Sequence, residues 1–268
     1  MNLQPVKIHF LMVCLVATYM SVCAKMISVP VNAPTISAAM LQVKKGDTII
    51  VEDGTYKEQI YITPGVTLIS KNLFKACINA NSKGTVVTMG NGSTISGFDI
   101  RNGTIGIFST SAGVSITKCR ILYNQQTGIM CVGHLPNIED NLIIYNKGSG
   151  IQGWDVQSTS FSINHNTISL NSNHGISVGG NSTIIVENNI ISNNDQFGIK
   201  TADEKVRITM TSNNFYQNAK FTGLLPVDNY SIEPKFKNAQ QLLFTLEQDS
   251  RCIGRASDNQ DIGARLVY

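Results

Sequence analysis

Short apolar stretches of three to five residues, separated by polar turns, make up most of this chain. From about residue 100 to residue 223 they follow a repeat in which a glycine and an apolar residue return every 22 to 25 residues. One copy contains the stretches Thr183–Glu187, Ile190–Ser192 and Gly198–Lys200. The pairs are Gly106-Ile107, Gly128-Ile129, Gly150-Ile151, Gly175-Ile176, Gly198-Ile199 and a less regular Gly223-Leu224.

This repeat predicts an all-β solenoid. Strands this short bury too little apolar surface alone, but strands stacked one period apart, at about 4.8 Å, pair with their copies and enclose a continuous apolar column. Three stretches per period predict a parallel β-helix with three faces. Leucine-rich repeats need a Leu-x-x-Leu-x-Leu core, left-handed β-helices need hexapeptide repeats, and propeller blades are about 40 residues long, so these folds fit less well.

Asparagines recur in step with the glycines. One precedes the glycine by four residues in five copies, or by five in the sixth, and a second lies five residues earlier in four copies. Asparagine tolerates the left-handed backbone angles of tight bends, and its amide can bond the same amide one coil away. Glycine relieves crowding between turn and strand. We interpret all these positions as structural. The asparagines are Asn102, Asn124, Asn146, Asn171, Asn194 and Asn218, and Asn141, Asn166, Asn189 and Asn213.

The two ends of the chain depart from the repeat. In residues 1–24, Lys7, an apolar stretch and small residues before a cut after Ala24 predict a signal peptide. An uncleaved anchor and a lipoprotein modified at Cys23 are the alternatives. We expect residues 25–46 to form an N-terminal cap with a short helix after Thr35, and residues 47–223 to form the β-helix. Residues 224–268 are expected to form a C-terminal cap over the last coil.

Composition limits the partners and cofactors. Charged residues make up 15% of the chain, the formal net charge is +3, and no run of Lys or Arg occurs. Nucleic acid binding needs a concentrated basic patch, so we exclude it; once the leader is cleaved, we also expect no stable membrane insertion. We expect no metal and no other cofactor; Ca²⁺ stays open, although no motif supports a site for it. The sequence allows two states for the remaining cysteines, paired in disulfides or buried as free thiols. These cysteines are Cys77, Cys119, Cys131 and Cys252.

Several further motifs accompany the repeat. They are Thr35–Ala39, Gly46–Val51, Gly54–Tyr56, Gly65–Ile69, Ser96–Ile100 and Asp261–Ala264. Together with the repeat they resemble the pectate-lyase-like superfamily of right-handed parallel β-helices over nearly the whole mature chain. The resemblance implies a right-handed helix. It implies less about activity, because this fold carries polysaccharide lyases, glycoside hydrolases, uronate epimerases, tailspikes and inert exported proteins.

The resemblance implies that substrate lies across the strand face that follows the Gly-Ile pairs. Alternation there points the isoleucines inward and the next residue outward. Aromatic faces stack on sugar rings, and amides and carboxylates bond sugar hydroxyls. The alternative to a sugar-binding role is that Trp154 is partly buried and packs over the edge of a coil. The candidate substrate-binding residues are Gln152, Trp154, Met130, Ser177 and His134, and the candidate catalytic residues are Asp155, Lys200 and His174.

Lyase and epimerase chemistry requires a base and a positive group that stabilises the developing charge. One lyase branch uses a lysine and an arginine one coil apart, but Lys200 has Ser177 and Leu225 at the matching positions. Mannuronan epimerases carry Asp-Pro-His-Asp, of which only the last aspartate matches at Gln152–Asp155 and at Lys200–Asp203. We interpret Asp203-Glu204 as a solvated turn.

These features lead to two functional hypotheses. The first is an exported protein, secreted or held in the periplasm or cell envelope, that binds an acidic polysaccharide as a monomer. Whether it also modifies that polymer, as a lyase or an epimerase, is left open. The second is a non-catalytic surface or adhesion protein in which the repeat builds a stable rod.

Overall fold

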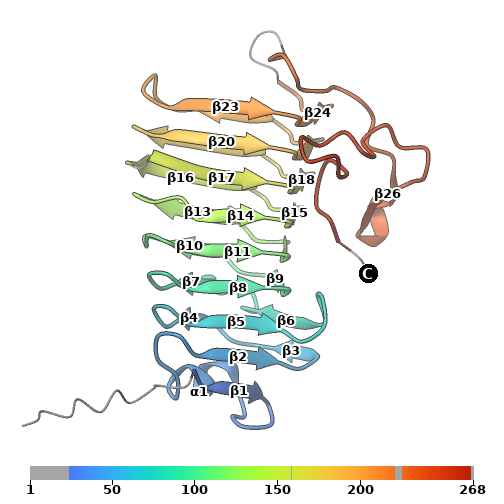
Figure 1. Ribbon diagram of the computed structural model, residues 1–268. Coiled ribbons are helices and arrows are strands. Elements are labelled where there is room, and N and C mark those ends of the chain that lie inside the picture. Colours follow the sequence, from blue (N-terminus) through green and yellow to red (C-terminus); the bar gives the residue numbers. More distant parts are fainter. Residues whose placement is uncertain (1–23, 158, 221–224, 267–268) are drawn as a thin grey trace, which may run out of the picture.

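Each coil of the chain contributes one short strand to each of three parallel sheets (Figure 1). The computed structural model describes residues 24–157, 159–220 and 225–266. The prediction of a three-faced parallel β-helix is confirmed. The predicted leader, apart from Ala24, and the pair Gly223-Leu224 lie outside the described residues. Within the described part of the chain, no helix is long and apolar enough to cross a membrane.

The three sheets are named A, B and C in the order in which each coil visits them. Sheet A consists of β1 (Met26–Val29), β2 (Thr48–Val51), β5 (Thr67–Ser70), β8 (Thr94–Ser96), β11 (Ser115–Thr117), β14 (Asn137–Glu139), β17 (Thr159–Asn164), β20 (Thr183–Glu187) and β23 (Arg207–Thr211). Sheet B consists of β3 (Gly54–Tyr56), β6 (Ala76–Asn79), β9 (Asp99–Arg101), β12 (Arg120–Leu122), β15 (Leu142–Ile144), β18 (Thr167–Ser169), β21 (Ile190–Ser192) and β24 (Asn214–Tyr216). Sheet C consists of β4 (Ile60–Ile62), β7 (Thr85–Met89), β10 (Ile105–Ser109), β13 (Ile129–Val132), β16 (Ile151–Val156), β19 (Ile176–Gly180) and β22 (Ile199–Thr201).

The core is a column of apolar side chains inside the coils. In sheet C, Ile107 pairs with Ile129, Ile129 with Ile151, and Ile151 with Ile176, and all four are fully buried. Ile199 continues the column at the end of the sheet and is half-buried. The predicted inward positions therefore stack on their own copies, which lets identical side chains pack without a change of shape from coil to coil.

Two columns of asparagine side chains line the corners of the coils. At the corner between sheets A and B, the Asn141 backbone N–H and side-chain amide donate to Asn166 Oδ1 at 2.9 and 3.0 Å. The Asn141 amide also donates to the carbonyl of Ile116 at 2.8 Å. The same pattern runs on through Asn189 and Asn213. The second column, at the corner between sheets B and C, runs through Asn124, Asn146, Asn171, Asn194 and Asn218.

The predicted left-handed angles belong to a different residue. They occur one position before the ladder asparagine, for example at Tyr145 (φ 54°) before Asn146 and at His165 (φ 50°) before Asn166. Asn102 also has φ 57°, because its coil is shifted by one residue and Gly103 stacks on Asn124. The ladder asparagines therefore act through their amides, and the preceding residue makes the bend.

The repeated glycines are required by close contact between coils. A Cβ atom on Gly128, Gly150 or Gly175 would lie 2.7, 2.8 or 2.6 Å from the carbonyl oxygen of the glycine in the next coil. Real Cβ atoms do not approach backbone atoms this closely. Only glycine fits at these positions, which confirms that the glycines relieve crowding between coils.

The N-terminal end carries the expected short helix. In α1 (Ile36–Met40) the Thr35 side chain accepts a bond from Ala38 N–H at 3.0 Å and caps the helix. The Glu58 carboxylate accepts bonds from Ile36 and Ser37 N–H at 3.0 and 2.9 Å. Strand β1 precedes this helix and pairs with β2, so sheet A begins inside the segment expected to be only a cap.

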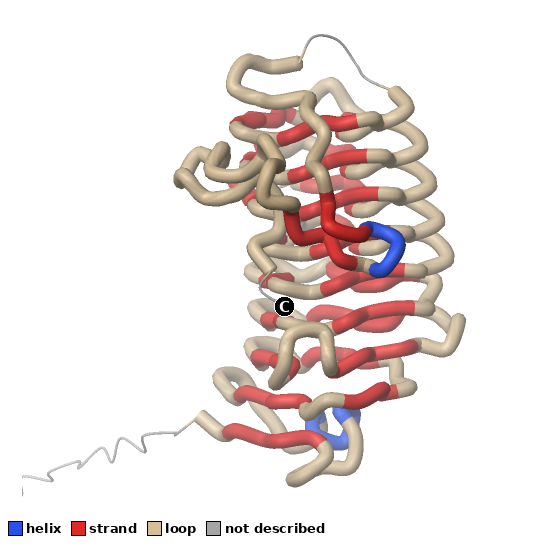
Figure 2. Tube along the Cα trace, turned by 90° about the vertical axis from the view of Figure 1, so that its right-hand side faces the viewer, coloured by secondary structure: helices blue, strands red, loops and turns tan. Residues whose placement is uncertain are grey.

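The C-terminal segment, here called the tail (residues 232–266), lies along the side of the coils rather than only over their last turn (Figures 1 and 2). It contains β25 (Phe236–Asn238), the 3-10 helix η1 (Ala239–Gln241) and β26 (Leu243–Leu246), with β25 and β26 antiparallel. Phe244 and Leu266 pack against the outer side of sheet B at Leu122, Leu142 and Ile144. These outward apolar residues explain why the segment folds back along sheet B.

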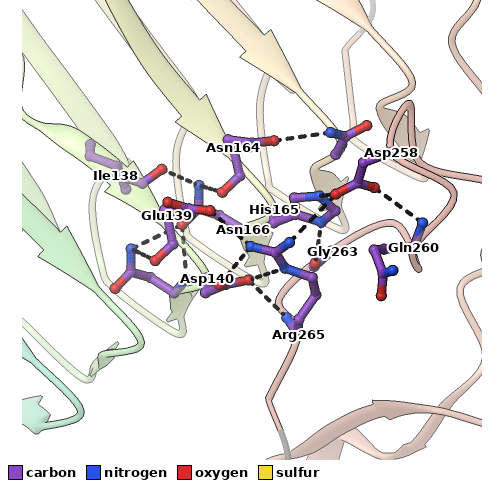
Figure 3. A network of polar contacts seen from close by, with 12 residues as sticks. Ile138, Glu139, Asp140, Asn164, His165, Asn166, Asp258, Gln260, Gly263 and Arg265 are labelled. Carbon is purple, nitrogen blue, oxygen red and sulfur yellow. Dashed lines mark hydrogen bonds and ion pairs between the residues drawn. The ribbon is translucent and has the colours of Figure 1, made fainter.

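A polar network, which we call the clasp, fixes the tail to the coils (Figure 3). Arg265 donates to both Asp140 oxygens at 2.8 and 2.9 Å and to Glu139 at 2.8 Å. The fully buried His165 ring lies 3.0 Å from Asp258 Oδ2 through Nε2 and 3.3 Å from the Gly263 carbonyl through Nδ1. Each ring nitrogen of His165 thus meets an oxygen atom of the tail, which ties this buried corner residue to the segment that covers it.

The four cysteines in the described part of the chain are free thiols. Cys119, Cys131 and Cys252 are buried and Cys77 is half-buried. Burial raises the pKa of Cys77 and Cys252 to about 11 and that of Cys119 to about 12. In this structure they are buried thiols rather than disulfides, which was one of the two alternatives.

The asparagine ladder should carry much of the stability. Asn166→Ala removes the acceptor of two Asn141 donors and the donor to the Ile138 carbonyl. Each buried polar group left without a partner costs about 1–3 kcal/mol, so we expect the free energy of unfolding in urea to fall by about 2–4 kcal/mol. The exposed Asn137→Ala on sheet A is the matched control and should change it by less than about 0.5 kcal/mol. Equal stability of the two variants would contradict the structural role of the ladder.

The clasp should weaken in acid. Burial opposes ionisation of Asp258, but the Gln260 backbone N–H, His165 and Arg265 together lower the pKa of Asp258 below its usual value of about 4. A lowered pKa stabilises the folded state above the unfolded pKa, and this contribution is lost as the pH falls through the folded pKa. Hydrogen exchange at β26, corrected for intrinsic rates, should therefore speed up as the pH falls below the usual aspartate pKa of about 4, while β20 stays protected. Asp258→Asn should produce part of this loss at neutral pH; unchanged β26 protection in both cases would refute the clasp.

Candidate functional site

The outer face of sheet C brings most of the predicted site residues together. By register, Met130 pairs with Gln152, Gln152 with Ser177, and Ser177 with Lys200. All four are half-buried, as expected for side chains standing side by side on a sheet. The face thus offers one outward side chain per coil, spaced by about 4.8 Å along the helix axis.

The column continues toward the N-terminal end with apolar and aromatic groups. Phe108 pairs with Met130, and Tyr61 lies two coils before Phe108. In the next outward column, Val132 pairs with Trp154. Tyr61 and Trp154 are 56% and 52% exposed, which leaves their ring faces open to a ligand. Trp154 therefore lies on the outer side of sheet C, as the alternation predicts, with about half of its surface exposed.

A β-bulge presents Trp154 together with Asp155. The register of β16 against β19 shifts between Gly153 and Val156, so two residues face one residue of the next coil. Asp155 has φ 46°, and its carboxylate accepts a bond from the Gln157 amide. Both Trp154 and Asp155 are exposed. The alternation of inward and outward residues predicted the outward position of Trp154, but it did not predict the bulge.

Glycines make room for this bulge. A Cβ on Gly180 would lie 2.3 Å from Val156 N and 2.9 Å from the Asp155 carbonyl carbon. The Gly180 N–H donates to the Asp203 carboxylate, and a Cβ on Gly179 would lie 2.8 Å from the same carboxylate oxygen. Asp203 is therefore tied to the strand beside the bulge rather than being only part of a solvated turn.

The loop that carries His134 also lies beside the bulge. Gly133 N–H donates to the Trp154 carbonyl and Gln157 N–H donates to the Gly133 carbonyl, each at 3.0 Å. His134 follows directly and is half-buried. This loop borders the same edge of sheet C as Trp154, which agrees with the predicted neighbourhood of His134.

A second group, which we call the cationic corner, lies at the other edge of sheet C and consists of His174, Phe197, Lys200 and Lys220. The Lys200 and Lys220 ammonium groups lie 5.2 and 5.8 Å from the centre of the Phe197 ring. The His174 ring lies 5.6 Å from the same ring. Cation–π contact with one aromatic ring thus gathers two positive charges from neighbouring coils.

Lys220 was missed by the sequence analysis. Counting from the glycine pairs put Leu225 at the position after Lys200, whereas the structure bridges Lys220 to Phe197. The last copy is longer than the others between asparagine and glycine. Counting from the ladder residue Asn218 puts Lys220 opposite Gln196, one residue away from its partner Phe197 in the structure.

His174 is fixed as a neutral hydrogen-bond donor. The Phe197 backbone N–H donates to His174 Nδ1 at 3.2 Å, which occupies that lone pair and leaves the ring proton on Nε2. Burial lowers the pKa of His174, and the charges of Lys200 and Lys220 lower it further. In this arrangement Nε2–H can donate to an anionic ligand, and Nδ1 is not available as a base.

The face combines groups suited to binding a long polar ligand. Exposed rings can stack on apolar ligand faces, and Gln152 is held by Thr127 Oγ1 at 3.0 Å from its Oε1. No group of three His, Cys, Asp or Glu side chains in the described ranges is placed to hold a metal ion. The arrangement supports recognition by stacking, hydrogen bonds and ammonium groups.

Comparison with known proteins gives the family. The sequence matches the family described as "Right handed beta helix region" over residues 45–185 and 153–240. No curated protein matches it. Among matching solved structures is the crystal structure of pectate lyase Pel9A, 12% identical, with a TM-score of 0.58 over 91% of this chain and 97% of that chain. At this identity the likeness establishes the fold alone. The chain therefore belongs to the right-handed β-helix family and has a pectate-lyase-like fold.

Proposed function

We propose that the protein binds an acidic polysaccharide along the outer face of sheet C. The observation that carries this proposal is the pairing of an open aromatic platform at Trp154 with two ammonium groups at Lys200 and Lys220, all on one face. A sugar ring stacks on the indole, and sugar carboxylates bind the ammonium groups. The similarity to a pectate lyase supports this choice of ligand.

The dimensions of the face fit a polymer. Coils repeat at about 4.8 Å, so successive outward side chains meet successive units of a chain that runs along the helix axis. Many weak contacts of this kind add along a long ligand. Export, which the leader pattern of residues 1–24 supports, would bring the protein to polysaccharides outside the cell.

Variants of the face should separate binding from stability. Trp154→Ala should lower the affinity for the polymer by about tenfold, if a sugar ring stacked on the indole contributes on the scale of the about 1–3 kcal/mol known for a nucleic-acid base on an aromatic side chain. Ile253→Ala, which removes a 42% exposed apolar side chain on the tail, is the matched control and should have no effect. Isothermal titration of each variant with a panel of acidic and neutral polysaccharides measures these affinities. Equal affinities of the two variants would remove Trp154 from the site.

The charge part of the proposal has its own test. The double variant Lys200→Ala/Lys220→Ala should weaken binding of acidic polymers at low salt, and added salt should weaken wild-type binding in the same way. Lys75→Ala, an exposed lysine at the corner between sheets A and B, is the control and should bind like the wild type. Binding that depends neither on these lysines nor on salt would remove the two ammonium groups from the site.

A second candidate function is lyase or epimerase action on the bound polymer. It is favoured by Asp155, which takes a left-handed backbone conformation within a strand, whereas most such residues in this chain occupy turns. Strained residues of this kind occur at functional sites. In an elimination, a base would take the proton beside the uronate carboxylate, a carbon–carbon double bond would form as the glycosidic C–O bond breaks, and the released oxygen would gain a proton and leave as the hydroxyl of the other polymer fragment.

Ultraviolet absorbance of the unsaturated product distinguishes a lyase from a binding protein. A lyase should produce this signal from polygalacturonate or alginate, and Asp155→Asn or Lys200→Ala should abolish it while Ile253→Ala retains it. An epimerase should instead change the uronate composition of the polymer, which nuclear magnetic resonance detects. The absence of both changes would leave binding without catalysis.

A further inference from the structure

The sign of the charge changes along the outer face of sheet C. The first part of the face, over coils β4 to β16, presents uncharged side chains on its outward columns. They are Tyr61, Thr88, Phe108, Met130, Val132, Gln152 and Trp154. Charged side chains on the face begin only at the bulge and beyond it, so different parts of one bound polymer meet different electrostatic surroundings.

The charges next to Trp154 are negative. Asp155 is the adjacent residue and is exposed, and its carboxylate is bonded only to a neutral amide in the contacts of the described chain. The Asp203 carboxylate is held by the backbone N–H of Gly180, the residue against which the Asp155 backbone packs. A ligand carboxylate placed on the indole would face both of these like charges, which is unfavourable.

The positive charges lie further along the same face. Lys200 is two ladder steps from Gln152, through Ser177, which places it about 10 Å from that coil. Neither Lys200 nor Lys220 forms an ion pair with a carboxylate among the described residues. Phe197 holds both ammonium groups without neutralising them. This corner therefore attracts an anionic group that the Trp154 position repels.

We propose that the outer face of sheet C selects polysaccharides by the spacing of their charged units. An uncharged sugar lies on Trp154, and an acidic sugar lies about two coils away at Lys200 and Lys220. This inference rests on the proposed binding of polysaccharide at this face. The ligand it selects is a polymer with acidic and uncharged units, such as a partly esterified polyuronate, rather than a uniformly acidic chain. Esterification removes the charge that Asp155 and Asp203 repel, and it adds apolar surface that the Tyr61-to-Trp154 part of the face can contact.

The experiment compares polygalacturonate that is unesterified, about half methyl-esterified, or fully methyl-esterified, with affinities measured at low salt. The half-esterified polymer should bind best. Asp155→Asn should raise the affinity for the unesterified polymer by up to about fivefold, the effect of one exposed like-charge contact. Asp228→Asn is the matched control, because Asp228 is also exposed and left-handed but lies beside Ser212 at the corner between sheets A and B, and it should change nothing.

Each outcome bears on a separate claim. If the unesterified polymer binds best and Asp155→Asn does not shift the preference, the charge pattern is wrong while binding of an acidic polysaccharide stands. If the fully esterified polymer binds best, and Lys200→Ala/Lys220→Ala binds it equally well, the acidic position is wrong. If none of the three polymers binds, the proposed function is contradicted and this inference falls with it.

Discussion

Hydrogen bonding between coils, strand on strand and in register, is the constraint on which the rest of this molecule depends. It holds successive coils at one spacing, so every residue must share its environment with the residue one coil above and one below. Isoleucine stacks on isoleucine in the core. Glycine recurs where the carbonyl of the next glycine leaves no space for a Cβ. Asparagine recurs because its side-chain amide donates to the asparagine of the next coil and accepts from the asparagine of the previous coil at the same time.

The same constraint decides where function can be placed. Inward positions and corners are fixed by stacking, whereas outward positions on a sheet can vary from coil to coil without disturbing the core. Trp154 occupies such a position, and the bulge at Trp154–Asp155 is tolerated because Gly180 in the next coil leaves it room. The cationic corner forms in the same way, since Lys220 comes beside Phe197 through the register and not through closeness in the sequence. A solenoid thus builds a site from single residues of separate coils.

The period of the sequence was enough to predict which residues stack, but not the local backbone angles. The strands Thr48–Val51, Thr183–Glu187 and Ile190–Ser192 and the helix cap at Thr35 follow directly from pattern. The left-handed bends were assigned to the ladder asparagines, because asparagine is common in such bends. In the structure they fall on residues as different as Tyr145, His165 and Leu170, since the ladder imposes the bend whatever the preceding residue is.

Features outside the period were harder to predict. The tail lacks the repeat, and its position along sheet B depends on contacts across about a hundred residues, such as Arg265 with Asp140. The bulge depends on the absence of side chains at Gly153 and Gly180, which the sequence shows but does not connect with a neighbouring strand. Lys220 was missed because the last copy departs from the period: Lys220 comes two residues after Asn218, whereas its partner Phe197 comes three residues after Asn194.

The three faces of the helix are not equally open to a ligand, and this supports the choice of sheet C. Outward leucine and isoleucine residues on sheet B are buried beneath the tail, and the earlier part of that face holds the buried Asp99 between Arg101 and Arg120. Sheet A is uncovered but presents short hydroxyl side chains over its first coils, such as Thr48, Thr67, Thr94 and Ser115, without an aromatic platform. Sheet C alone among the described faces joins exposed rings to charges that lack an ion-pair partner. Because the clasp fastens the tail at the corner between sheets A and B, the tail covers the apolar outer side of sheet B and leaves sheet C open.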